Sequence, residues 1–158
     1  MAFRDGDGWV MCSCGHKHWG LHGAAGLLLI RLDMPEPHVL LQLRAEWSHS
    51  GGTWGIPGGA LKMGEDAVGA ALRESHEEAG VPADYVRVLE TSVLDLGFWS
   101  YTTVLAIADD YFEPVAMDLE SAALEWVPMS AVQDRDLHPG FGRAWADLRA
   151  LLENQLRD

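Results

Sequence analysis

The stretch from Gly59 to Val81, GALKMGEDAVGAALRESHEEAGV, joins a glycine-containing loop to a segment rich in alanine and glutamate. Asp66 is a residue type that caps helix N-termini, and no proline follows it before Ala79. Gly80 and Pro82 then form the usual stop signal for a helix. We therefore predict a helix over residues 66–79, preceded by a loop.

Three glutamates of the predicted helix form a dense negative patch. Glu74 and Glu78 are one turn apart and Glu77 lies three residues after Glu74, so the three side chains project from neighbouring positions on one face. Like charges at this spacing destabilise an isolated helix, and a bound cation would compensate. Carboxylates suit hard ions such as Mg²⁺ or Mn²⁺. Arg73, four residues before Glu77, is placed to hold that carboxylate by an ion pair.

Two glycines precede the helix and add to the metal hypothesis. Gly58 and Gly59 allow the backbone to pass close to the helix, which would let a carbonyl oxygen face the same metal. The alternative is a solvated acidic helix face, which is the commoner explanation of an arbitrary Glu-Glu pair. The fixed spacing of so many glycines and charged residues favours the metal site.

Composition and charge narrow the class of protein. A chain of 158 residues with 48% hydrophobic and 22% charged residues is typical of one soluble globular domain. The sequence shows neither a secretory signal nor an apolar run of the roughly 20 residues that span a bilayer, so we expect a cytoplasmic protein with no membrane partner. The net charge of −13 argues against binding a nucleic acid polymer. A small anionic substrate would need divalent metal ions to screen it from the acidic protein. The sequence leaves open whether the protein forms a homodimer.

Outside the glutamate-rich stretch, strand-like segments alternate with turn-rich ones. Residues 45–59 are dense in Gly, Ser, Trp and Pro, and we expect a structured loop there. Residues 141–156 carry apolar side chains spaced by three or four, as on one helical face. Strands are expected at residues 23–32, 38–44, 85–94, 100–108 and 124–127. Strands interspersed with two helices predict one mixed sheet with helices against its faces.

The glutamate-rich stretch resembles the Nudix box, and the similarity to MutT-like Nudix hydrolases covers roughly residues 23–157. The resemblance implies an α/β fold of the α/β/α sandwich type with a mixed central sheet. It divides the chain into an N-terminal extension, residues 1–22, and a Nudix domain, residues 23–158. Ser75 departs from the pattern, because an aliphatic residue is usual there. The positions that match are Gly59, Glu65, Arg73, Glu74, Glu77, Glu78, Gly80 and Val81.

The resemblance also implies roles for these residues. Glu74 and Glu78 become the principal metal ligands, Glu77 a further ligand, and Gly58 a carbonyl donor, while Glu65 and Arg73 orient the others. The implied reaction is Mg²⁺-dependent hydrolysis of a phosphoanhydride bond by metal-activated water, with Mn²⁺ able to substitute. The substrate would be a nucleoside triphosphate or a nucleotide sugar. The rival hypothesis is a non-catalytic Nudix-like module that binds a nucleotide as a sensor.

Two further regions match places where Nudix enzymes keep site residues. Glu120 lies where an additional loop carboxylate assists as ligand or base, although an ordinary loop glutamate is an equal alternative. His138 and Phe141 precede the last predicted helix, where MutT-like members contact the nucleobase. Phe141 would stack on a base, but it also fits the apolar stripe of that helix, and core packing is the favoured interpretation.

A cluster of cysteines and histidines lies near the N-terminus, at Cys12, Cys14, His16 and His18. Zinc accepts such ligands, which makes a structural zinc site one hypothesis. A single residue between the cysteines is unusual, because most structural zinc sites have two. A short strand or turn with free thiols is the alternative.

Overall fold

In a computed structural model of the chain, the predicted apolar segments form the central strands of a mixed sheet. The structure describes residues 6–157 except 14, 16 and 49. β3 (Ala24–Arg31) is buried along almost its whole length. It pairs antiparallel with β4 (His38–Arg44) and parallel with β8 (Ser100–Ala108), where Ala24 faces Tyr101 and Ile30 faces Ile107. A strand with neighbours on both sides and helices over both faces has no wet face, which explains its continuous apolar run.

The seven-stranded sheet runs in the order β5-β4-β3-β8-β7, with β6 paired to β3 and β9 paired to β4. β7 (Val86–Asp95) and β9 (Ser121–Pro128) correspond to predicted strands, although β9 begins three residues earlier than expected. The expected loop over residues 45–59 contains two short strands, β5 (Trp54–Gly55) and β6 (Gly58–Ala60). These segments are strands because their backbones pair with β4 and β3, which local composition alone does not predict.

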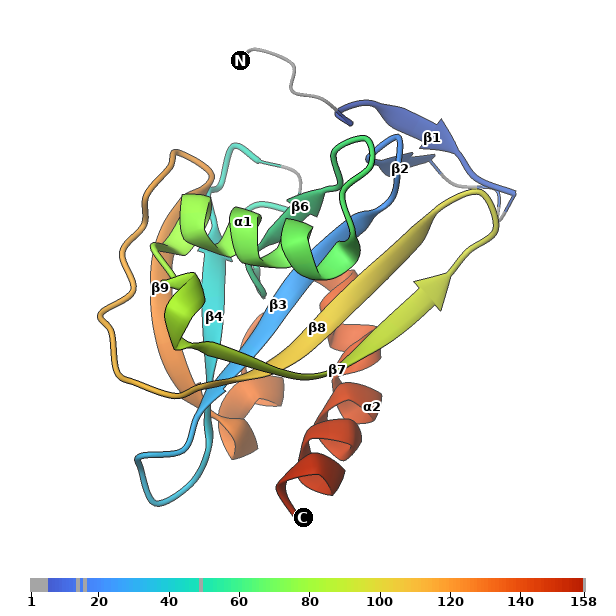
Figure 1. Cartoon of the computed structure of the whole chain (residues 1–158). Coiled ribbons are helices and arrows are strands. Elements are labelled where there is room, and N and C mark those ends of the chain that lie inside the picture. Colours follow the sequence, from blue (N-terminus) through green and yellow to red (C-terminus); the bar gives the residue numbers. More distant parts are fainter. Residues whose placement is uncertain (1–5, 14, 16, 49, 158) are drawn as a thin grey trace.

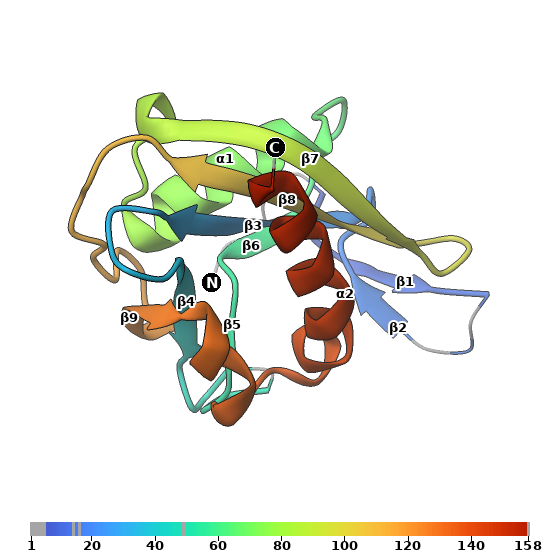
Figure 2. The ribbon, with the colours of Figure 1, turned by 90° about the horizontal axis from the view of Figure 1, so that it is seen from below.

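Two long helices complete the sandwich, and they lie on either side of the sheet in Figures 1 and 2. α1 (Ala67–Ala79) packs on Leu27 and Leu29, whereas α2 (Pro139–Leu156) packs on Leu28 and Ile30. Successive side chains of a strand point to opposite faces, so this alternation places the helices on opposite sides. Short 3₁₀ helices, Ala83–Tyr85 and Met129–Asp134, join the layers. The predicted α/β/α sandwich is confirmed.

The N-terminal segment forms its own small sheet from β1 (Trp9–Met11) and β2 (Lys17–Trp19). The Cys12 thiol donates to the Leu96 carbonyl, with an Sγ–O distance of 2.6 Å, and the His18 ring stacks on Trp99 with 4.3 Å between ring centroids. The hairpin is thereby attached to the turn between β7 and β8. Cys14 and His16 lie outside the described residues. No helix in the described part of the chain is long and apolar enough to cross a membrane.

The apolar stripe of α2 gives a stability prediction. Leu152 is fully buried against the sheet, so Leu152→Ala should lower the free energy of unfolding by about 2–5 kcal/mol through lost contacts and an internal cavity. Asp147→Ala, on the exposed side of the same helix, should change it by less than about 0.5 kcal/mol. Urea unfolding of the two variants checks this, and equal effects would contradict the packing.

Candidate active site

α1 presents its glutamates to the sheet, and its ends are fixed by local bonds. Asp66 accepts a hydrogen bond from the Gly69 amide at 2.7 Å, and Gly80 closes the helix in the left-handed conformation with φ 68°. Glu74 and Glu78 are buried, with 9% and 4% of their surface exposed. The Glu77 side chain remains 35% exposed at the edge of the same face. The helix therefore directs two of the three predicted ligands inward and leaves the third beside solvent.

The glycines of β6 make room for these carboxylates. A Cβ on Gly59 would come within 2.6 Å of the Glu74 carboxyl carbon, and a Cβ on Gly58 would lie 2.4 Å from the Ala25 carbonyl oxygen. The Gly58 amide donates to Glu78 Oε2 at 3.1 Å. Side chains at either position would force α1 and β3 away from β6. The predicted role of the Gly58 carbonyl as a metal ligand stays a prediction, and what is observed is its amide holding Glu78.

Arg73 connects the loop before α1 to the glutamates on it. Its Nε and Nη2 donate to the two carboxylate oxygens of Glu65, each at 2.9 Å, and its Nη1 donates to Glu74 at 2.8 Å. The ion pair expected with Glu77 is present but longer, at 3.5 Å. The paired guanidinium holds the pKa of Glu65 below its ordinary value. Two-point bonding of this kind fixes direction as well as distance, which suits an orienting role.

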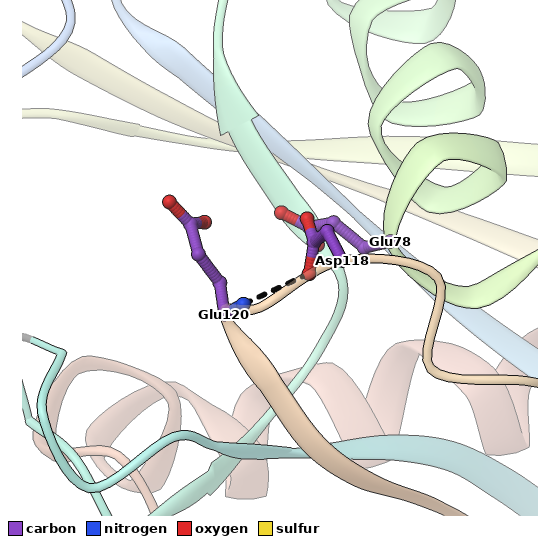
Figure 3. Close-up of side chains that lie close together, drawn as sticks. All are labelled: Glu78, Asp118 and Glu120. Carbon is purple, nitrogen blue, oxygen red and sulfur yellow. Dashed lines mark hydrogen bonds between the residues drawn. The ribbon is translucent and has the colours of Figure 1, made fainter. Parts of the chain in front are cut away.

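A second pair of carboxylates approaches α1 from the loop that leads into β9. Oxygens of Glu78, Asp118 and Glu120 lie within 4.8 Å of one another. Figure 3 shows how the three side chains approach from α1 and from the loop. The loop is held there by its backbone, because the Met117 amide donates to the Glu78 carbonyl at 2.9 Å. Glu120 was expected here from the sequence, whereas Asp118 was not. Two acidic residues separated by one position, directly before a strand, were the available signal.

Glu78 is the electrostatic centre of this cluster. Burial raises the pKa of its carboxyl well above the ordinary value, and the charges of Glu74 and Asp118 raise it further, against the opposing effect of the Gly58 amide. Such a site favours either a proton or a metal cation. Oxygen ligands from several carboxylates match the preference of Mg²⁺ and Mn²⁺.

The two residues expected to contact a nucleobase, His138 and Phe141, lie at the start of α2. Phe141 is buried in the core, with its ring 5.7 Å from that of Trp145. This position favours the core interpretation of Phe141. His138 caps the helix, since its Nδ1 accepts from the Gly140 amide at 3.1 Å.

The comparison with known families settles the class of protein. A family model described as the NUDIX domain matches residues 20–148. The chain belongs to this family. The resemblance found in the sequence is confirmed. The chain is accordingly a hydrolase of phosphoanhydride bonds that acts on small nucleotide substrates, as Nudix hydrolases do.

Several relatives share most of this chain. A Mycobacterium tuberculosis protein provisionally named 8-oxo-dGTP diphosphatase 3 is 49% identical over 153 residues, which cover 92% of this chain and 70% of the relative. A nucleoside triphosphate pyrophosphatase/Nudix hydrolase fusion protein from Bifidobacterium longum is 46% identical over 95% of this chain and 32% of its own length. The crystal structure of the Nudix hydrolase RenU from M. smegmatis has 46% identity and a TM-score of 0.88, covering 94% of this chain and 96% of RenU.

Ser75, the departure from the Nudix box, is accommodated without an unsatisfied polar group. The side chain is fully buried, and its hydroxyl donates to the Leu72 carbonyl at 3.1 Å. A serine that bonds back to its own helix avoids the cost of a buried, unpaired hydroxyl. Serine at this position therefore leaves no unpaired hydroxyl inside the helix.

Burial of the Glu78 carboxyl predicts a stability effect in the absence of metal. At pH 7 in EDTA, Glu78→Gln should raise the melting temperature, by about 2–4 °C per kcal/mol of relieved desolvation and repulsion. Because the folded-state pKa is raised, the wild type loses stability as pH rises from the ordinary value of 4.5 through that raised pKa. The advantage of the variant should therefore vanish below pH 4.5. Thermal melts across pH measure it, and a lower melting temperature for the variant at pH 7 would contradict it.

Proposed function

We propose that this Nudix hydrolase is a Mg²⁺-dependent pyrophosphohydrolase of nucleoside triphosphates. The observation that carries the proposal is the convergence of Glu78 with Asp118 and Glu120, next to the buried Glu74. The M. tuberculosis relative, by its name, supplies the first substrate to test, 8-oxo-dGTP. Nucleotide sugars, the other substrate class that the family resemblance implies, form the comparison set.

The residues present fit a hard divalent cation. Glu74, Glu78, Asp118 and Glu120 would hold it, with Glu77 as a partly exposed further ligand. Ionisation of the buried Glu78 requires a counter-charge, because burial and the neighbouring carboxylates raise its pKa, and the donors gathered around it are carboxylate oxygens. A bound divalent cation supplies neutralisation of phosphate charge and acidification of a water molecule. Mn²⁺ is expected to substitute, since it accepts the same oxygen donors.

The side chains divide the remaining work of the reaction. Arg73 holds Glu65 and Glu74 in fixed directions, which keeps the ligand set ordered before substrate arrives. Glu120 is exposed, whereas Glu78 is buried, so Glu120 is the carboxylate that an incoming water meets and the one assigned to accept its proton. The Nudix box provides no serine, cysteine or lysine nucleophile paired with a base, so attack by water is the proposed chemistry.

The Cys/His cluster carries a separate proposal, a structural zinc bound by Cys12, Cys14, His16 and His18. Two of these side chains face the turn between β7 and β8, where Cys12 donates to Leu96 and His18 stacks on Trp99. A metal at this position would join the hairpin to that turn. Its support is the ligand chemistry of the sequence.

Turnover by ligand variants tests the catalytic proposal. Glu78→Gln should lower kcat for 8-oxo-dGTP by about a hundredfold or more, because charge stabilisation of the transition state is lost. Glu120→Gln should lower it less, and Glu153→Gln, whose carboxylate pairs with Arg149 on α2, should leave it unchanged. Steady-state assays across Mg²⁺ and Mn²⁺ titrations measure these effects. Metal-independent turnover near the wild-type rate by folded Glu78→Gln would refute the site.

Metal analysis tests the zinc proposal. Protein purified without chelator should contain about one zinc ion per chain, and the double variant Cys12→Ser, Cys14→Ser should lose it and melt at a lower temperature. Atomic spectroscopy and thermal melts supply the two measurements. If the wild type carries no zinc, or the double variant keeps both its metal content and its melting temperature, the proposal fails.

A further inference from the structure

A buried glutamine connects the two halves of the acidic cluster. Gln42 lies on β4 with 3% of its surface exposed, directly after the fully buried Leu40 and Leu41. Its amide nitrogen donates to Glu78 Oε2 at 3.3 Å and to the Ser121 hydroxyl at 2.5 Å. A polar side chain inside an apolar strand costs stability unless its hydrogen bonds are made. Gln42 uses its amide to link α1 to the start of β9.

A bulge in β9 places Ser121 where Gln42 can reach it. Leu43 faces Ala123, but Arg44 faces Ser121, so Ala122 has no partner on β4. Without the bulge, Ala122 rather than Ser121 would lie opposite Arg44. Ser121 is buried, and its hydroxyl lies 3.5 Å from Asp118 Oδ1. Bulges re-aim side chains in this way, and they recur beside active sites.

Backbone amides and side chains both hold the carboxylates of the cluster. The Met117 amide bonds to the Glu78 carbonyl, and the Ala45 amide bonds to the Glu120 carbonyl, each at 2.9 Å. These bonds hold the loop beside α1 and β4. Two further backbone amides reach the carboxylates themselves, because the Gly58 amide donates to Glu78 Oε2 and the Glu120 amide donates to Asp118 Oδ1, each at 3.1 Å. The bonds from Gln42 to Glu78 and to Ser121, with Asp118 beside Ser121, act on the directions of those carboxylates.

We propose that Gln42, through Ser121, is a positioning residue that holds Glu78 and Asp118 at the separation a divalent cation requires. The inference rests on the proposed metal-dependent function and adds a determinant of cation affinity outside the Nudix box. Gln42 suits this position because its neutral amide donates to a carboxylate, whereas a glutamate there would add another negative charge to the cluster. Groups that orient metal ligands commonly affect affinity without being ligands themselves.

The test measures cation binding directly. Gln42→Leu keeps a similar volume and removes the donors, and Ser121→Ala breaks the next link. Each should weaken Mn²⁺ binding, followed by the electron paramagnetic resonance of free Mn²⁺, by about tenfold or more. The Mg²⁺ concentration for half-maximal turnover should rise in parallel. Ser75→Ala is the matched control, because it removes a buried serine hydroxyl that bonds only to its own helix among the described residues.

The outcomes separate this inference from the proposed function. A wild type that binds no Mn²⁺ and shows no Mg²⁺-dependent turnover overturns the proposed function. Wild-type binding with unchanged Mn²⁺ affinity in folded Gln42→Leu and Ser121→Ala overturns the positioning role alone. A purely structural role would lower the melting temperature in EDTA without changing the affinity of the folded protein. If Gln42→Leu does not fold, the affinity of Ser121→Ala decides the question.

Discussion

Burial of the Glu78 carboxylate is the constraint on which the rest of the site depends. A charged group removed from water needs hydrogen-bond donors and a counter-charge nearby. The Gly58 amide and the Gln42 amide are the donors, and they come from two different strands of the sheet. The close approach of β6 to β3, which only glycine permits at position 58, brings the first of these donors within reach. Two strands of the sheet therefore supply the hydrogen-bond donors for one carboxylate of α1.

The local parts of the site were predictable because their geometry follows from helical spacing. Glu74 and Glu78 are one turn apart on any helix, and the capping residue and the stop signal were both visible in the sequence. Arg73 shows where this logic ends. Spacing predicted its pairing with Glu77, whereas its shortest bonds go to Glu65 and Glu74. The pairing with Glu65 depends on the loop folding back along the helix, which no periodicity encodes.

The remaining parts of the site depend on tertiary contacts between distant segments. Asp118 reaches Glu78 because the loop is tied to the end of α1 through Met117, and Ser121 turns inward because one residue of β9 is skipped. Neither event leaves a local pattern of its own. β5 and β6 were not predicted for the same reason, since each is a strand only because its backbone pairs with a neighbouring strand. The family resemblance predicted the α/β/α sandwich, whereas the position of the loop carboxylates depends on long-range backbone hydrogen bonds.

The parallel pairing of β3 with β8 also constrains how the chain folds while it is being synthesised. Ala24 must wait for Tyr101 to be synthesised before the centre of the sheet can close. Contacts between such distant segments form slowly, and exposed apolar strands in a partly made chain are prone to aggregate. The acidic cluster comes later still, because Asp118 and Glu120 follow β8 in the sequence. A ribosome-bound fragment that ends with β8, at Ala108, therefore carries the complete Nudix box without the loop carboxylates that its helix faces.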